Sequence, residues 1–215
     1  MNFIEIPMEQ WTRKTHYEQY KNNVRCSFSV TVDIDISNLL TRLKERGLKS
    51  YPAQIYMLST IVNHFPEFRM TTNEDGHLGY WDTTYPMYTV LNSDTQTFSA
   101  VWTKYDTYFE KFYQAYLRDS KQYVNGELFP QKDTPRNVFN ISSVPWLDFT
   151  AFNINVFSDG SYLLPIITIG RYKKQDDKTL MPLAIQCHHT VCDGYHVGRF
   201  VEALRNMALN PEHWL

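Results

Sequence analysis

The chain has 215 residues and a formal net charge of −2, with 21 Lys and Arg against 23 Asp and Glu. This length suffices for one domain with a sizeable core, and the lack of a basic block argues against nucleic acid as a partner. The N-terminal residues do not form a secretion signal, and no stretch approaches the roughly 20 apolar residues of a membrane span. We therefore expect a cytoplasmic protein that has no membrane partner and, with three cysteines, no disulfide framework.

Apolar periodicity predicts alternating helices and strands in the first half of the chain. The clearest signal covers 26–36, where apolar and polar residues alternate and one face of a strand is expected to be buried. In chain order the pattern predicts a helix over 9–22, a strand over 26–36, a helix that begins at an N-capping Ser37 and ends at Gly47, a helix with Pro52 in its first turn, and strands over 78–81, 87–91 and 97–102.

The second half is predicted to contain a long helix, four strands and a final helix. No linker or repeat divides the chain, so we expect a single domain over 1–215 of the α+β, or mixed α/β, class, with a large, mostly antiparallel or mixed sheet flanked by helices. The predicted elements are a helix over 108–117, a loop over 126–136, strands over 138–143, 149–156, 162–172 and 180–187, hairpin connections at Asp159-Gly160 and Lys174–Lys178, and a helix over 196–207.

Most of the chemistry in the sequence lies just after the last predicted strand, in His188-His189-Thr190-Val191-Cys192-Asp193-Gly194. Adjacent strand residues point to opposite faces, so one histidine should face a cleft and the other should pack inside. Histidine has a reference pKa of about 6.5, which suits it to remove a hydroxyl proton near neutral pH. Asp193 follows an apolar linker and would be costly there without a cationic partner.

The same segment also offers side chains that bind zinc. They are Cys187, His188, His189, Cys192, Asp193 and His196. Strand alternation places the first three on two different faces, and the spacing of the six residues fits no familiar zinc motif, so we expect no metal site.

The pattern His-His-x-x-x-Asp-Gly resembles the active-site signature of the chloramphenicol acetyltransferase family. The acyltransferase cores of 2-oxo acid dehydrogenases and peptide-synthetase condensation domains share it, but the former usually follow a lipoyl domain and the latter are much longer. Further stretches resemble the first family in its own order, which implies its CoA-dependent acyltransferase fold. They are Gln10–Tyr20, Tyr51–Ala53, Pro66–Met70, Tyr88–Val90, Thr97–Ala100, Asn140–Trp146 and Pro165–Thr168.

The resemblance implies transfer of the acetyl group of acetyl-CoA to the 3-hydroxyl of chloramphenicol, an antibiotic-resistance reaction, in a homotrimer with active sites at subunit interfaces. By position in the motifs, His189 resembles the general base, Ser142 the serine that stabilises the oxyanion, and Thr168 the threonine that holds a water at the same intermediate. Asp193 and Arg13 match an ion pair that holds the shape of the site. An acetyltransferase of the same fold that acts on another alcohol or amine is the alternative.

The resemblance also implies two sets of binding residues. Gln19 departs from it, because close relatives often carry an aromatic residue there, and this leaves the fine shape of the acceptor pocket open. The acceptor pocket draws on Tyr20, Cys26, Phe98, Asn140, Phe152 and Ile154. Acetyl-CoA is expected to meet Trp146 and Tyr172 along its pantetheine arm, and Lys49, Tyr51, Arg171 and Lys173 at its anionic end.

Overall fold

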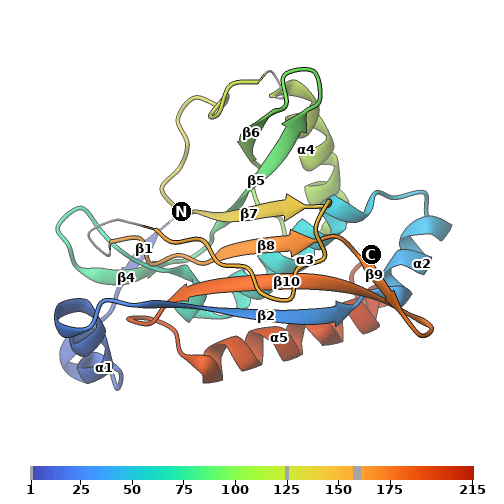
Figure 1. The fold of residues 1–215 in the computed structure, drawn as a ribbon. Coiled ribbons are helices and arrows are strands. Elements are labelled where there is room, and N and C mark those ends of the chain that lie inside the picture. The colour runs from blue at the N-terminus through green and yellow to red at the C-terminus, as the bar shows by residue number, and fades with distance from the viewer. Residues whose placement is uncertain (1, 124–125, 157–160) are drawn as a thin grey trace.

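A computed structural model describes residues 2–123, 126–156 and 161–215. A mixed seven-stranded sheet forms the centre of the molecule and a three-stranded sheet lies beside it (Figure 1). The large sheet contains β2 (Ser27–Asp35), β5 (Tyr85–Asn92), β6 (Thr97–Trp102), β7 (Val138–Val144), β8 (Ile166–Gly170), β9 (Lys173–Gln175) and β10 (Lys178–His188), and the small sheet contains β1 (Phe3–Glu5), β3 (Met70–Thr72) and β4 (Leu78–Trp81).

The helices complete the mixed architecture, so the predicted fold class is confirmed. Gly47 ends the second helix with a φ of 65°, a backbone conformation that glycine adopts without strain. The α-helices are α1 (Lys14–Glu18), α2 (Ser37–Glu45), α3 (Ser50–His64), α4 (Phe109–Gln122) and α5 (Gly194–Leu209), and short helical turns cover Met8–Gln10, Gln19–Asn23, Pro66–Arg69 and Pro211–His213.

The directions of the strands determine at which end of the large sheet the C-terminal end of each strand lies. The order is β2-β10-β8-β7-β5-β6, with β9 paired to β10. β7 is parallel to both β5 and β8, whereas β10 is antiparallel to β8 and to β2. The C-terminal end of β10 therefore lies at the opposite end of the sheet from the C-terminal ends of β7 and β8, as the arrows in Figure 1 show.

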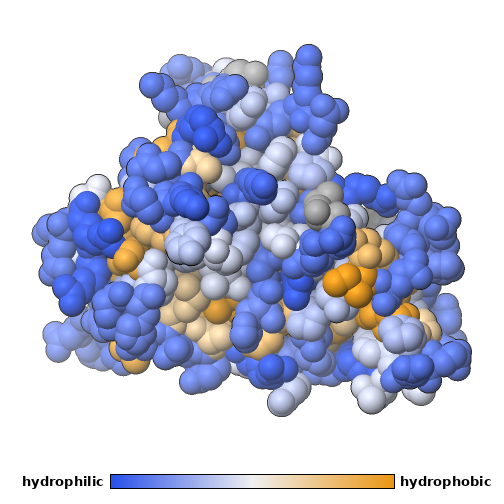
Figure 2. Space-filling view, turned by 180° about the vertical axis from the view of Figure 1, so that it is seen from behind, coloured by the Kyte–Doolittle hydropathy of each residue, from blue (hydrophilic) through white to orange (hydrophobic). Residues whose placement is uncertain are grey.

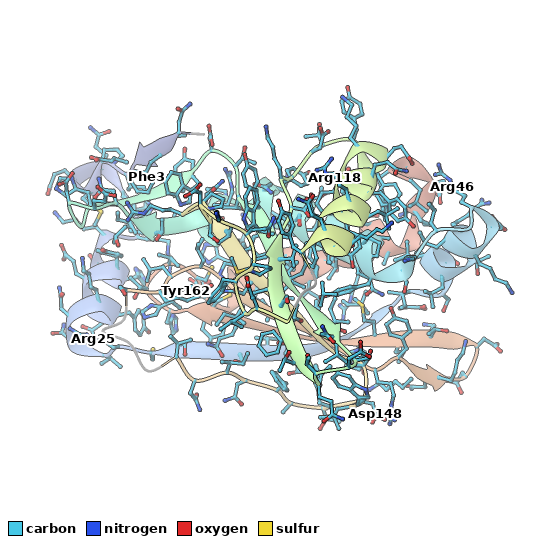
Figure 3. All side chains as sticks on the ribbon, turned by 90° about the horizontal axis from the view of Figure 1, so that it is seen from above. Phe3, Arg25, Arg46, Arg118, Asp148 and Tyr162 are labelled. Atoms are coloured by element: carbon cyan, nitrogen blue, oxygen red, sulfur yellow. The ribbon has the colours of Figure 1, made fainter. Side chains whose placement is uncertain are left out.

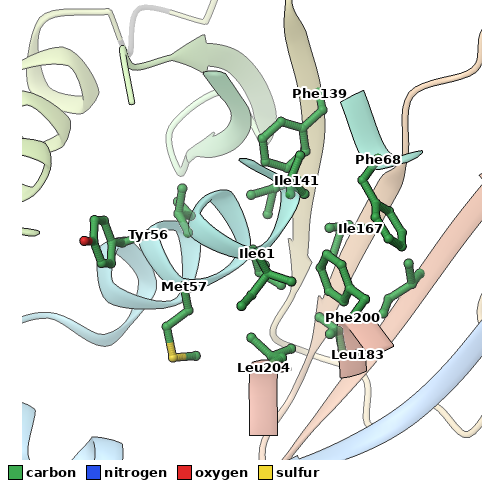
Figure 4. Packing of buried hydrophobic residues seen from close by; sticks show 14 of the residues in the cluster. Tyr56, Met57, Ile61, Phe68, Phe139, Ile141, Ile167, Leu183, Phe200 and Leu204 are labelled. Carbon is green, nitrogen blue, oxygen red and sulfur yellow. The ribbon is translucent and has the colours of Figure 1, made fainter. Parts of the chain in front are cut away.

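The core lies between one face of this sheet and the helices. Ile141, Ile167 and Ile185 are in register on neighbouring strands and are almost fully buried, as expected for side chains on one face. Figure 4 shows the residues that pack there, with Met57 and Ile61 from α3, Phe200 and Leu204 from α5, and Ile141, Ile167 and Leu183 from the strands.

Two of the predicted strands are wrong in whole or in part. Residues 149–156 form no strand, because the backbone N–H groups of Phe152 and Ile154 donate to the side chains of Thr31 and Gln186 instead of to a ladder. The strand predicted over 162–172 is shortened to β8, which begins just after Pro165, a residue with no N–H to donate to a ladder. The predicted turn at Asp159-Gly160 lies outside the described residues.

The helix boundaries also differ from the predictions. The helix predicted over 9–22 is broken into a short turn, α1 and a π-helical turn. Ser37 does not cap α2, because its hydroxyl donates to Asp35 and accepts from the backbone N–H of Thr179.

In the described part of the chain, no helix combines the length and hydropathy needed to span a membrane. Figure 2 shows a mostly hydrophilic surface with separate hydrophobic areas on the side opposite to Figure 1.

Phe200 offers a direct test of this core. It is fully buried, and its ring centroid lies 4.8 Å from that of Phe68. Phe200→Ala should lower the free energy of unfolding by about 3–5 kcal/mol, because it removes buried apolar surface and leaves a cavity. The matched control is Leu209→Ala in the same helix, where the side chain is 60% exposed and the effect should be small. Denaturant unfolding followed by tryptophan fluorescence makes the measurement, and equal losses in both variants would contradict this description of the core.

Candidate active site

Two hydroxyl groups lie side by side on the sheet face opposite the core. Ser142 of β7 is in register with Thr168 of β8, so both side chains point to the same face, and their oxygen atoms are 3.2 Å apart. Thr168 is 2% exposed, whereas Ser142 is only partly buried. A pair of neighbouring hydroxyl donors of this kind can stabilise an oxygen that becomes negatively charged in a reaction.

A large cavity opens beside Ser142 because β5 and β7 diverge. Their ladder ends at the pair of Tyr88 and Ile141, although β5 continues to Asn92 and β7 to Val144. The cavity has a volume of about 1160 Å³, and both diverging strands line it. The cavity is large enough for an extended ligand of drug size or more. Eight predicted site residues line it, namely Ser142, Asn140, Phe98, Ile154, Trp146, Tyr172, Tyr51 and Arg171.

His189 lies one residue beyond β10, in an aromatic setting. Its backbone N–H donates to the carbonyl of Cys26, and its ring stacks on Tyr20 with centroids 4.0 Å apart and planes only 8° from parallel. Phe28 packs against the same ring at 5.2 Å. Among the described residues, the buried Nδ1 of His189 has no hydrogen-bond partner. The ring is therefore held by stacking, which fixes its plane without engaging that nitrogen.

His188 has a different environment. Its Nδ1 accepts a hydrogen bond from the backbone N–H of Thr190, and the side chain lines a narrow cavity of about 160 Å³ together with Cys26 and Tyr162. Figure 3 labels Tyr162 and Arg25, which both line this cavity. Burial, and then the neighbouring His189, lower the pKa of His188. The two adjacent histidines thus occupy separate environments.

Asp193 organises the loop that follows His189. It caps α5 by accepting from the backbone N–H of Tyr195, and Arg13 contacts it with an Nη1–Oδ2 distance of 2.5 Å. Nδ1 of His196 lies 2.9 Å from its other oxygen, Oδ1. Burial alone raises the pKa of Asp193, but the hydrogen bond from Arg13 and the charges of His196 and Arg13 outweigh burial and hold the pKa below its ordinary value.

Two buried thiols flank the His-His segment. The Cys192 Sγ lies 3.6 Å from the carbonyl oxygen of Glu67, and a side-chain hydrogen bond with Cys187, followed by burial, raises its pKa well above the ordinary value. Burial also raises the pKa of Cys26. All three cysteines are free, and no group of three or more His, Cys, Asp or Glu side chains in the described residues could hold a metal ion.

The hydroxyl pair and His189 lie far apart within one chain. Ser142 is in register with Thr168, and Thr168 with Ala184 of β10. His189 is five residues beyond Ala184, so a rise of about 3.3 Å per residue and a spacing of about 4.8 Å between strands put Ser142 and His189 on the order of 20 Å apart. One chain therefore does not bring both groups to one reacting atom.

The remaining predicted binding residues are spread around these two places. Phe152 lies on the segment that crosses β2, and the backbone N–H of Lys49 donates to the hydroxyl of Tyr113. Two of the three cations predicted for the anionic end of acetyl-CoA are in surface ion pairs, Arg171 with Asp148 and Lys173 with Asp33, each at 2.7 Å. Such solvent-accessible pairs contribute little to stability.

The sequence interpretation missed two functional candidates, Tyr162 and His196. Asn140 was expected in a pocket, but its partner was not identified, and the structure shows its amide donating to the hydroxyl of Tyr162 at 2.6 Å. His196 was considered only as a metal ligand, yet it completes a capping box with Asp193. The three-residue spacing from a capping residue to a hydrogen-bonding side chain is the signal that could have identified it.

Comparisons with known proteins agree over nearly the whole chain. The family model described as chloramphenicol acetyltransferase matches residues 1–205. A chloramphenicol acetyltransferase of Clostridium perfringens is 47% identical over 216 residues, covering 100% of this chain and 99% of that protein. One of Bacillus pumilus is 48% identical, covering 96% and 94%, and one of Staphylococcus aureus is 41% identical, covering 100% of each.

Solved structures show the same fold. A chloramphenicol acetyltransferase superposes with a TM-score of 0.88 at 21% identity, covering 96% of this chain and 100% of that one. A dihydrolipoamide acetyltransferase of Azotobacter vinelandii gives a TM-score of 0.68 at 16% identity, covering 93% and 87%.

The contacts of Asp193 predict a pH-dependent stability. A carboxyl group whose folded pKa is lowered stabilises the fold above its unfolded pKa, near 4, and loses that contribution as the pH falls through its folded pKa. Asp193→Asn should therefore lower the melting temperature at neutral pH, and the difference from the wild type should shrink as the pH falls from about 5 to about 3. The loss should stay below the roughly 3–5 kcal/mol of a fully buried pair, because the Asp193 side chain is 30% exposed.

Thermal unfolding across this pH range, followed by circular dichroism, makes the measurement. Asp148→Asn is the matched control, because its partner Arg171 is equally well placed but both side chains are about half exposed, so the melting temperature should change little. A difference between wild type and Asp193→Asn that stays constant across the pH range would show that the charge of Asp193 does not stabilise the loop.

Proposed function

This chain belongs to the chloramphenicol acetyltransferase family, and we propose that it transfers the acetyl group of acetyl-CoA to the 3-hydroxyl of chloramphenicol. The observation that carries the proposal is the match to curated chloramphenicol acetyltransferases over the full length of the chain, at 47% identity for one of them, together with a family model that matches residues 1–205. The reaction inactivates the antibiotic, and we place it in the cytoplasm.

We propose that His189 is the general base. A neutral imidazole takes the proton of the acceptor hydroxyl while the hydroxyl oxygen attacks the thioester carbonyl. The tetrahedral intermediate then collapses by breaking the carbon–sulfur bond, and the protonated His189 returns the proton to the leaving sulfur of CoA. The acetyl group passes directly to the acceptor. The stacking of Tyr20 on His189 supports this role, because it fixes the plane of the ring that moves the proton.

Ser142 is the proposed donor to the oxyanion of that intermediate, and Thr168 is proposed to hold a water beside it. Their hydroxyl groups are within hydrogen-bond distance of each other, and Ser142 lines the large cavity. A donor already in place stabilises charge that develops in the transition state without the cost of reorganising solvent.

The separation of the two groups supports an active site shared between chains. A base and an oxyanion donor must each lie within about 3 Å of the same intermediate, and one chain holds His189 and Ser142 on the order of 20 Å apart. We propose a homotrimer in which His189 of one subunit faces Ser142 of the next. A head-to-tail contact of this kind uses two different surfaces and closes into a ring.

Two features near β2 support such a contact. β2 is nine residues long and lies at one end of the strand order, so its outer edge has no neighbour among the described strands. Residues 151–156 are largely exposed and form no ladder within the described part of the chain. A strand edge without a neighbour and a segment outside any ladder can pair through backbone hydrogen bonds, as in sheets that continue across subunits.

The large cavity is the proposed site of the pantetheine arm of acetyl-CoA. Trp146, Tyr172 and Tyr51 line it, and Arg171 and Lys173 lie at one end of the sheet, where they would exchange their aspartate partners for phosphates. The acceptor is proposed to meet Cys26 and Tyr20 near His189, and Phe98, Asn140, Phe152 and Ile154 near Ser142.

The assay that tests the activity follows the free thiol of CoA released from acetyl-CoA. The wild-type protein should release CoA only when chloramphenicol is present, and release with a different alcohol or amine but not with chloramphenicol would contradict the proposed acceptor.

His189→Ala should reduce turnover by roughly 10²–10⁴, because a positioned base contributes that much. The control is His77→Ala, an exposed histidine in the turn before β4. A folded His189→Ala protein that kept more than about a tenth of wild-type turnover would remove His189 from the role of base.

Ser142→Ala should lower turnover by about 10²–10³, with little change in the KM for chloramphenicol, because an oxyanion donor acts mainly in the transition state. Mixing this variant with His189→Ala under conditions that exchange subunits should restore activity, because a mixed trimer contains sites with both wild-type residues. A fully active monomer by light scattering at the assay concentration would refute the shared site.

A further inference from the structure

A buried chain of hydrogen bonds connects the wall of the large cavity to helix α4. The hydroxyl of Tyr88 lies 2.8 Å from that of Thr103, and Thr103 donates to Asp119 at 2.9 Å. Tyr88 and Thr103 are fully buried and Asp119 is 8% exposed. Arg118, labelled in Figure 3, pairs with the other oxygen of Asp119 at 3.1 Å. A buried carboxylate is energetically costly unless it accepts hydrogen bonds or pairs with a cation, as Asp119 does here.

The donors and acceptors in this chain of hydrogen bonds can be assigned. A carboxylate only accepts hydrogen bonds, and a threonine hydroxyl has a single proton to donate. Thr103 gives that proton to Asp119, so it must accept from Tyr88, and Tyr88 is the donor. Burial strongly raises the pKa of Tyr88, which keeps its proton in place for this donation. Asp119 therefore orients Tyr88 through Thr103.

Tyr88 occupies the position where the cavity begins. It belongs to the last pair of the ladder between β5 and β7, and beyond it the two strands separate. Its ring lies 4.8 Å from that of Tyr116 and 6.4 Å from that of Tyr51, and these two rings are 6.3 Å apart. All three line the cavity, and we call them the tyrosine wall. The hydroxyl of Tyr51 also reaches the carbonyl of Thr89, one residue beyond the ladder.

We propose that Thr103 and Asp119 are positioning residues for acetyl-CoA: they hold Tyr88, and through it the tyrosine wall, in the orientation that receives the pantetheine arm. This inference rests on the proposed function, which assigns the cavity to acetyl-CoA. Neither residue contacts the cavity, since neither is among the residues that line it. Their effect should appear in the binding of acetyl-CoA and not in proton transfer or in binding of the acceptor.

The test compares substitutions that break the hydrogen bonds from Tyr88 through Thr103 to Asp119 with matched substitutions that keep them. Thr103→Val is close in shape but neither accepts from Tyr88 nor donates to Asp119, whereas Thr103→Ser keeps the hydroxyl. Asp119→Ala removes the acceptor, whereas Asp119→Asn keeps a carbonyl oxygen that accepts. Thr103→Val and Asp119→Ala should raise the KM for acetyl-CoA by about fivefold or more, with kcat within about twofold and the KM for chloramphenicol unchanged. The two conservative variants should remain close to the wild type.

Tyr88→Phe keeps the ring and removes only the hydroxyl, so it tests the inference if Thr103→Val does not fold. Gln114→Ala, on the exposed side of α4, controls for changes in the helix. Calorimetric titration with CoA should give the same ranking of variants as the KM values. Wild-type KM for acetyl-CoA in folded Thr103→Val and Tyr88→Phe would overturn the inference, as would an equal rise in KM for both substrates. A wild-type protein that binds CoA but does not acetylate chloramphenicol would instead refute the proposed function.

Discussion

The antiparallel orientation of β10 relative to β7 and β8 is the constraint on which the rest of the site depends. Both proposed chemical groups lie toward the C-terminal ends of their strands, and the orientation sends those ends to opposite sides of the sheet. In the proposed mechanism, the single chain carries two halves of a site, each with its own supporting contacts: Tyr20 and Asp193 around the histidine, and the large cavity around the serine. The proposed chemistry itself then requires assembly of more than one chain.

Much of this arrangement could be predicted from the sequence, because the relevant signals are local. Strict alternation over 26–36 predicted β2, and the transition from an apolar run to His-His and Asp-Gly predicted a strand end before a helix. Strand direction is a long-range property that periodicity does not contain, and only the family resemblance implied a site shared between chains. Residues 149–156 were assigned wrongly because their apolar pattern suits a strand, while their backbone N–H groups bond to the side chains of Thr31 and Gln186.

The same distinction applies to side-chain networks. Arg13 and Asp193 are 180 positions apart in the sequence. The residues around Asp193 indicate that it needs a cationic partner, but only the family resemblance identified Arg13 as that partner. The chain from Tyr88 through Thr103 to Asp119 had no such signal. Each residue has an ordinary setting in the sequence, a strand, a strand end and a helix, and only packing of α4 against the sheet brings the three together.

The raised pKa of Cys26 has a chemical consequence for a protein that handles thioesters. A thiolate exchanges acyl groups with a thioester far more readily than a neutral thiol does, and Cys26 lies beside His189, through the backbone bond of that residue. Burial raises the pKa of Cys26, which makes its thiolate form rarer at any given pH. A rarer thiolate exchanges acyl groups with a thioester more slowly, which in the proposed reaction favours transfer of the acetyl group to the acceptor hydroxyl.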